Sequence, residues 1–187
     1  MLRVPQDIAS LAAEGAIVTE HVSVIRYEAL DTVAALPVLV TQPTFVLVAS
    51  GTKQLRTEHA EVVIAREGEL LFMRSGTHVM SEFRGEHGGY RSLIVSVSKA
   101  FLREAIGLPT ATADAARVVV TKPAAHTRRL LAELPETLVR AGGEAERQFK
   151  LRELLVGMTG DPEVRALVFG EIASWGSTIE EHLVSVV

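Results

Sequence analysis

The stretch from Phe45 to Val79 constrains the fold of this chain more than any other. It reads FVLVASGTKQLRTEHAEVVIAREGELLFMRSGTHV, which divides into short strand-like segments. Polar or glycine-containing dipeptides follow these segments, at Ser50-Gly51, Glu58-His59, Glu67-Gly68 and Ser75-Gly76. Short strands at near-regular spacing are typical of an antiparallel sandwich or barrel, and they argue against alternating strands and helices.

The segments within this stretch differ in hydrophobic pattern. Phe45–Ala49 and Leu70–Met73 are continuously apolar, which predicts strands that are buried on both faces. Lys53–Thr57 and Glu61–Arg66 alternate, which predicts strands with one face in water.

The flanking segments extend the strand pattern. Glu20–Leu30 alternates loosely between apolar and polar residues, while Leu36–Val40 and Tyr90–Val97 are strand-like apolar runs. Sheet structure is therefore expected up to Val97.

From Ser98 onward the hydrophobic period becomes helical. Ser98 is a suitable N-cap for one short helix, and the chain after Pro123 reads as several longer ones. Pro135 is expected to kink or interrupt the first of these. Gly176 is expected to end the third, because the capping box Ser177–Glu180 follows it and opens a fourth.

The composition narrows the classes of function. There are no cysteines, which excludes disulfides and thiol chemistry and fits a reducing cytoplasm. The net charge is −4 and no Lys/Arg-rich run exists, so these residues alone are not expected to bind nucleic acid. The uncharged run Thr32–Thr52 is broken by Pro37 and Pro43, so buried strands are expected there and no membrane segment.

Six histidines raise the question of a metal site. A metal-binding barrel of the cupin type needs a His-x-His pair on one strand face, then a glutamate and a later histidine. The residues LPVLVTQPT before Phe45 contain no histidine or carboxylate, and only His78 lies where the late histidine would. One ligand does not hold a metal. We therefore expect no metal, no cofactor and no enzyme activity.

Four segments together are similar to a known family. PVLVTQPTFVLVASGTKQL, EGELLFMRSGTHVMSEF and YRSLIVSVSKAFLREAIG resemble, in this order, the N-terminal regulatory region of AraC/XylS-type transcription regulators. QFKLRELLVGMTGDPEVRALV resembles the helix and short turn that precede the last helices of that region. Some members that answer to a protein partner have a closely similar GELLF-x-x-x-G segment.

The resemblance implies a mainly β fold with α: a metal-free, cupin-like double-stranded β-helix barrel over residues 15–121, then a helical dimerisation unit over residues 122–187. It implies a cytoplasmic homodimer that senses a small-molecule or protein effector. DNA binding would reside in a C-terminal helix-turn-helix domain that these residues do not contain. Because the last helix stops on apolar residues at Val187, we expect the native chain to continue. The alternatives are a stand-alone cupin-like binding protein and a metal-dependent cupin enzyme.

Candidate site residues follow from side-chain type and expected burial. A ligand pocket is predicted from large or polar groups on buried-type strands: Phe45, Phe72, His78 and Tyr90. A dimer interface is predicted from the apolar stripe of the helix over Glu144–Met158: Phe149, Leu151, Leu154, Leu155 and Met158. Most of the barrel arginines are expected to be surface charges, but any that points inward would need a partner and could hold an anionic ligand. These arginines are Arg56, Arg66, Arg74, Arg84 and Arg91.

Overall fold

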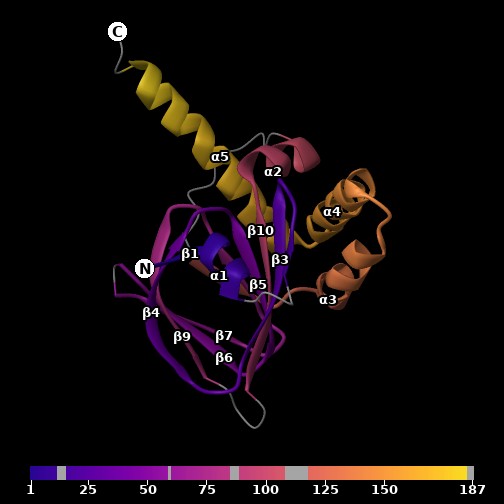
Figure 1. Ribbon diagram of the computed structural model, residues 1–187. Helices are drawn as coiled ribbons and strands as arrows, with labels where there is room; N and C mark the ends of the chain where they lie inside the picture. Colours follow the sequence, from indigo (N-terminus) through magenta and orange to yellow (C-terminus); the bar gives the residue numbers. More distant parts are fainter. Residues whose placement is uncertain (12–15, 59, 85–88, 108–117, 185–187) are drawn as a thin grey trace.

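Among the described residues, eleven strands form two sheets that face each other (Figure 1). The sheets enclose an apolar interior. The structure is a computed structural model that describes residues 1–11, 16–58, 60–84, 89–107 and 118–184, without the side chains of residues 11, 33, 34 and 174–184. Sheet A has the strand order β1-β4-β9-β6-β7, and sheet B has the order β11-β8-β5-β10-β3-β2.

The strands of sheet A are β1 (Leu2–Val4), β4 (Val33–Val40), β6 (Thr52–Thr57), β7 (Val62–Arg66) and β9 (Thr77–Arg84). Those of sheet B are β2 (Ala16–Val18), β3 (Val22–Ala29), β5 (Thr44–Ser50), β8 (Leu70–Met73), β10 (Tyr90–Val97) and β11 (Val118–Thr121). The helices are α1 (Gln6–Leu11), α2 (Lys99–Ile106), α3 (Ala125–Arg140), α4 (Glu144–Met158) and α5 (Pro162–Val184). Apart from the parallel pair β1–β4, neighbouring strands are antiparallel.

Glycines allow the tight turns that the sequence predicted. Gly51, Gly68 and Gly76 have φ angles of 81°, 80° and 78°, a backbone conformation that residues with a side chain rarely adopt. At Gly51 a Cβ atom would also lie 2.6 Å from the backbone oxygen of Arg84, so only glycine fits. These three turns are confirmed, whereas the predicted Glu58-His59 turn includes His59, which lies outside the described residues.

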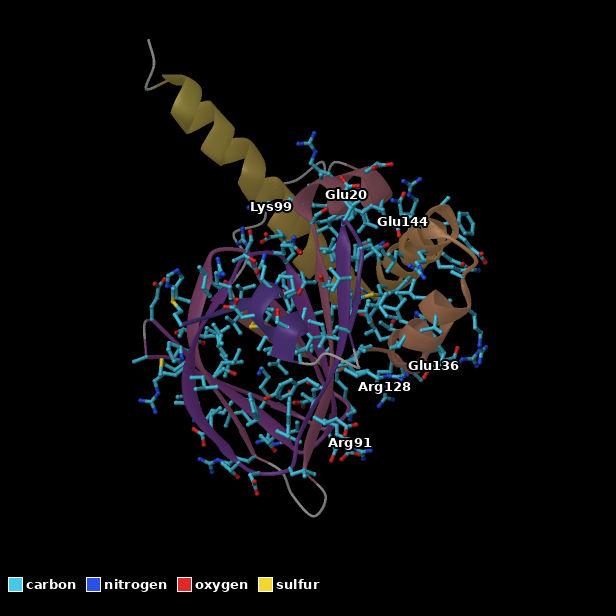
Figure 2. All side chains as sticks on the ribbon, viewed as in Figure 1. Glu20, Arg91, Lys99, Arg128, Glu136 and Glu144 are labelled. Atoms are coloured by element: carbon cyan, nitrogen blue, oxygen red, sulfur yellow. The ribbon has the colours of Figure 1, made fainter. Side chains whose placement is uncertain are left out.

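Sheet B separates two apolar cores. Its inner face and sheet A enclose the barrel interior, to which Val46, Leu71 and Ile94 contribute. Its outer face packs against α2–α5, and Phe45 and Phe72 belong to that second core. Figure 2 shows side chains filling the space between the barrel and α3 and α4. The prediction that Phe45–Ala49 and Leu70–Met73 are buried on both faces is thus confirmed over most of both strands.

The two longest helices differ from the expected pattern. α3 continues through Pro135, whose side chain is buried. α5 is one helix from Pro162 to Val184, so the prediction of a break at Gly176 and a new start at Ser177 is wrong. A glycine inside a helix costs only about 1 kcal/mol, which the neighbouring helical residues can offset. In Figure 1 α5 runs past the barrel and projects away from it.

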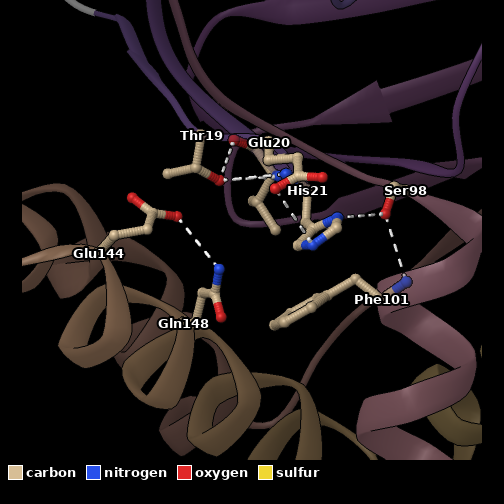
Figure 3. Close-up of polar contacts among 8 residues, drawn as sticks. Thr19, Glu20, His21, Ser98, Phe101, Glu144 and Gln148 are labelled. Carbon is tan, nitrogen blue, oxygen red and sulfur yellow. Dashed lines mark hydrogen bonds and ion pairs between the residues drawn. The ribbon is translucent and has the colours of Figure 1, made fainter.

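The start of α2 is fixed by the predicted cap. Ser98 Oγ accepts a hydrogen bond from the Phe101 backbone N–H at 3.3 Å. The His21 ring stacks on Phe101 with 5.5 Å between ring centroids, and its Nδ1 lies 3.4 Å from Ser98 Oγ (Figure 3). These contacts attach α2 to the turn that precedes β3.

Asp161 fixes the start of α5, and we predict that Asp161→Ala lowers the free energy of unfolding by about 1–2 kcal/mol at pH 7. Its carboxylate accepts hydrogen bonds from the backbone N–H groups of Ala124 at 2.9 Å, Glu163 at 3.0 Å and Val164 at 3.4 Å. These bonds, foremost that from Ala124, lower the pKa of Asp161 below 3.8.

Because this pKa is depressed in the folded state, the stabilisation is complete above pH 3.8 and is lost as the pH falls through the folded-state pKa. Urea denaturation at pH 7 and pH 3 tests this. Asp161→Asn, which keeps an acceptor oxygen, serves as the control and should lose less. An Asp161→Ala loss that is as large at low pH as at pH 7 would contradict the assignment.

Candidate functional site

A cavity lies inside the barrel between the two sheets. The centres of water-sized spheres can occupy about 80 Å³ of it. Its walls are mostly apolar and come from both sheets and from the N-terminal segment: Leu2, Val4, Ile8, Tyr27, Leu36, Val38, Val46, Lys53, Leu55, Met73, Val79, Ser81, Phe83, Tyr90, Ser92 and Ile94. Since about 10–15 Å³ of such space admits one water, the cavity has room for a group of several non-hydrogen atoms.

The N-terminal segment forms one side of this cavity. β1 pairs in parallel with β4, which places Leu2 and Val4 against the interior. α1 follows directly and contributes Ile8. The Thr41 hydroxyl donates a hydrogen bond of 2.7 Å to the Val4 carbonyl oxygen, which attaches this segment to the end of β4.

Lys53 is the unusual wall residue. It lies on β6, and its neighbour at the same face, Leu55, is also buried. Only 8% of Lys53 is exposed, and its Nζ donates a hydrogen bond of 2.9 Å to Ser81 Oγ. No carboxylate among the described residues forms an ion pair with it. Burial lowers the pKa of Lys53 from 10.5 to about 8, because the charged form loses its hydration.

Aromatic rings partly replace the missing counter-charge. Lys53 Nζ lies 5.0 Å from the centroid of the Phe83 ring and 5.9 Å from that of Tyr90. The two rings are stacked at 5.0 Å, and Tyr27 meets Phe83 edge-on at 5.2 Å. The cation is therefore held in a fixed aromatic environment inside the barrel.

Two buried hydroxyls lie in the same wall. Tyr90 Oη and Ser92 Oγ make no hydrogen bond of full geometry with any described group. Burial raises the pKa of Tyr90, and the nearby Ser92 hydroxyl offsets part of this rise. Buried polar atoms in native proteins nearly always have partners. The ammonium group of Lys53 and the hydroxyls of Tyr90 and Ser92, in the wall of one apolar cavity, match an acceptor-rich group such as a carboxylate, which takes several hydrogen bonds on two oxygens.

The predicted pocket residues are only partly brought together. Tyr90 lines the cavity, whereas Phe45 and Phe72 face the helices and pair with each other at 4.9 Å. His78 is exposed on the outer face of sheet A. On β9 the inward positions are the odd-numbered ones, from Thr77 to Phe83, so an even-numbered residue points outward. The prediction is corrected for these three residues.

The residues predicted for a dimer interface have two different placements. Leu151, Leu154, Leu155 and Met158 are buried in the core that α4 shares with sheet B and the other helices. Phe149 is 64% exposed, and Val156, seven residues further along α4, is 54% exposed. An interface on α4 must therefore use the face that carries Phe149, and the four buried residues serve the protomer's own core.

Sequence reasoning missed Lys53, whereas its expectation that an inward-pointing barrel arginine would be paired holds for Arg74. Of the five barrel arginines proposed, four are exposed, and Arg74 alone is largely buried, with its charge paired to Glu171 at 2.7 Å. Lys53 lies on a strand whose alternating pattern predicted one face in water. The sequence did contain a signal, because Lys53 is two residues before Leu55 and therefore lies on the same, buried face of the strand.

Neither a metal centre nor a membrane span appears in the described part of the chain. No group of three His, Asp or Glu side chains is placed to hold a metal ion there. No helix in that part is long and apolar enough to cross a membrane.

The central part of the chain matches a regulatory domain. Residues 43–124 match the model of the ExsA N-terminal regulatory domain. The matched segment contains β5–β11 and α2, and so includes Lys53, Tyr90 and Ser92. A search among curated protein sequences found no match.

Solved structures of ToxT from Vibrio cholerae are similar to this chain. An apo form of a ToxT variant from strain SCE256 gives a TM-score of 0.61 at 10% identity, covering 76% of this chain and 55% of that one. Wild-type ToxT with bound unsaturated fatty acid gives 0.53 at 10% identity, with 76% and 56% covered. ToxT from strain O395 bound to (E)-4-(8-methylnaphthalen-1-yl)but-3-enoic acid gives 0.51 at 10% identity, with 74% and 56% covered.

This chain thus spans little more than half the length of the ToxT chains. The likeness confirms the expected fold class, a cupin-like β barrel followed by helices.

Proposed function

Given that this chain is similar in sequence and fold to the N-terminal regulatory domain of AraC-type transcription regulators, we propose that it senses a small-molecule effector bound in the barrel cavity. The role is non-enzymatic and cytoplasmic. Control of transcription would pass to a DNA-binding domain that follows this region in the whole protein.

Lys53 is the observation that carries this proposal. A buried ammonium group without a carboxylate partner lowers stability, because desolvation of the charge costs several kcal/mol. Such groups are found preferentially at sites of function. A ligand carboxylate in the cavity would pair with Lys53 and would accept hydrogen bonds from Tyr90 and Ser92.

The cavity walls favour an effector with an apolar body and one carboxylate. Apart from the polar group around Lys53, the lining side chains are aliphatic or aromatic. Two ToxT structures contain ligands of this class, an unsaturated fatty acid and an aryl alkenoic acid. The free cavity is small, so a long acid would have to displace side chains of the N-terminal segment such as Leu2 or Ile8.

Thermal unfolding of the 187-residue chain with matched acids and alcohols tests the proposal. At concentrations about a hundredfold above Kd, a ligand is expected to raise Tm by about 5–10 °C. Hexanoate, decanoate and palmitoleate are compared with hexanol, decanol and palmitoleyl alcohol. We expect larger shifts for the acids, and a loss of this difference in Lys53→Met. Equal shifts for acid and alcohol, or no shift with any probe, would contradict the proposal.

We also propose that residues 122–187 mediate homodimerisation through the outer face of α4. Phe149 and Val156 form an exposed apolar stripe there, and Lys150 Nζ lies 5.7 Å from the Phe149 ring centroid. Two copies of one helix, related by a two-fold axis, can bury such a stripe against each other.

A further inference from the structure

Glu171 joins the last helix to the barrel through one buried polar cluster. It lies on α5, is 1% exposed, and accepts a hydrogen bond of 2.7 Å from Arg74 Nε. It also accepts hydrogen bonds from Ser75, at 2.9 Å from the hydroxyl and 3.3 Å from the backbone N–H. The Arg74 side chain is 14% exposed. Removing one partner of a charge pair this well buried is costly, because the other charge is left uncompensated.

The same turn is continuous with the cavity wall. Arg74 directly follows Met73, which is 3% exposed, lies at the end of β8 and lines the cavity. On the far side of the turn, Thr77 Oγ1 donates a hydrogen bond of 2.6 Å to the Arg74 carbonyl oxygen. The Gly76 N–H donates one of 2.8 Å to the Val40 carbonyl oxygen. A displacement of Met73 by a ligand would therefore act on a short, well-anchored turn.

α5 is suited to amplify a movement at Glu171. Its first half is fixed by the Asp161 cap and by the buried side chains Val164, Val168 and Ile172. Beyond Glu171 the helix continues to Val184, about 20 Å further along its axis at 1.5 Å per residue. This second half leads away from the barrel in Figure 1. A small change in the direction of this second half would thus shift the far end of the helix by more than the turn itself moves.

We propose that the cluster of Arg74, Ser75 and Glu171 couples the cavity to α5, so that a change at Met73 alters the position of the last helix. The inference rests on the proposed function for its biological meaning, because an effector would be the natural cause of such a change. The physical coupling itself is a property of this chain alone. Coupling of this kind requires that the ligand make different contacts in the two arrangements, and Met73 is the cavity-lining residue that directly precedes the cluster.

A double-mutant cycle on the 187-residue chain tests the coupling without any ligand. Met73→Ala perturbs the cavity wall beside the turn, and Val38→Ala, a buried wall residue on sheet A, is the matched control. Each is combined with Glu171→Gln, which keeps the shape of the side chain and removes its charge. Amide hydrogen exchange along α5, normalised to that of β10, separates a local effect from global destabilisation.

Met73→Ala is expected to speed exchange in the second half of α5 by about fivefold with Glu171 present, and by less than about twofold with Glu171→Gln. Val38→Ala should change α5 exchange less than about twofold in both backgrounds. Fluorescence of Trp175, the single tryptophan and a residue of α5, provides a second readout.

Equal Met73→Ala effects with and without Glu171→Gln would overturn the proposal, as would equal effects of Met73→Ala and Val38→Ala. If Glu171→Gln fails to fold, Ser75→Ala removes one donor to the same carboxylate and should reduce the coupling. Coupling found in a chain that binds no acid would refute the proposed ligand and leave this inference intact.

Discussion

Replacing Lys53 by methionine is expected to stabilise the fold by about 2 kcal/mol at pH 7. The folded-state pKa of Lys53 is about 8 and that of an exposed lysine is 10.5. This difference corresponds to about 3 kcal/mol of destabilisation at any pH below 8. Methionine keeps most of the apolar stem and removes the charge. Loss of the hydrogen bond to Ser81 costs about 1 kcal/mol and reduces the gain to about 2 kcal/mol. A gain in stability from deleting a charged group distinguishes this site from an ordinary buried ion pair.

The pH dependence of this gain has a definite sign. The pKa of Lys53 is lowered by folding, so the unfolded chain binds more protons between about pH 8 and 10.5. Over this window the stability of the wild-type chain should rise relative to that of Lys53→Met. Near pH 10.5 the remaining difference in stability should approach the contribution of the hydrogen bond to Ser81, which favours the wild type. Tyr27 and Tyr90, whose pKa values burial raises, are present in both variants, so the difference between the variants at each pH reports mainly on Lys53.

Urea denaturation of both variants from pH 7 to pH 10 measures this difference. Lys122→Met, at an exposed position, is the control and should change stability by less than about 0.5 kcal/mol at every pH. A Lys53→Met variant that is less stable than the wild type at pH 7 would show that the ammonium group is already compensated. The same variant links stability to function, because it should also lose the preference for acids over alcohols.

The strands and their turns could be predicted because the local signals agree. Gly51, Gly68 and Gly76 mark turns by their position between apolar and alternating segments, and all three have the left-handed backbone that such turns require. Burial of the run around Phe45 on both faces followed from its lack of polar residues. These features depend on residues close together in the chain.

The side on which each residue of a buried strand lies could not be predicted. In a continuously apolar strand, neighbours such as Phe45 and Val46 face different cores, and only the tertiary arrangement decides which core holds the cavity. His78 lies on the alternating strand β9, where it points outward and its neighbours Thr77 and Val79 point inward. Here too only the tertiary arrangement decides which set of residues faces the interior. Lys53 was overlooked because lysine in an alternating strand is usually solvated, and its burial depends on β9 packing alongside β6.

Phe149→Asp and Leu151→Asp should have opposite consequences although the two residues lie on the same helix. Phe149 is 64% exposed, so an aspartate there should change the stability of the monomer by less than about 0.5 kcal/mol. If α4 forms the proposed interface, the same substitution buries two carboxylates against each other and removes the apolar anchor. The dimer dissociation constant should then rise by about a hundredfold or more.

Leu151 is 2% exposed within the core shared by the helices and sheet B. An aspartate there leaves an unpaired charge in an apolar environment and should cost more than about 4 kcal/mol, enough to unfold a marginally stable domain. Light scattering gives the oligomeric state and far-UV circular dichroism reports folding. Val62→Asp, at a position that is 47% exposed on β7, is the control for a surface charge elsewhere.

A folded Phe149→Asp chain that remains as dimeric as the wild type would remove α4 from the interface. A folded, monomeric Leu151→Asp chain would instead show that this leucine belongs to the interface and that the protomer core tolerates its loss. The two substitutions therefore distinguish residues of the protomer core from residues of the interface, which the sequence pattern had grouped in one apolar stripe. On α4 the residues at 151, 154, 155 and 158 complete the core, and those at 149 and 156 remain available to a second copy.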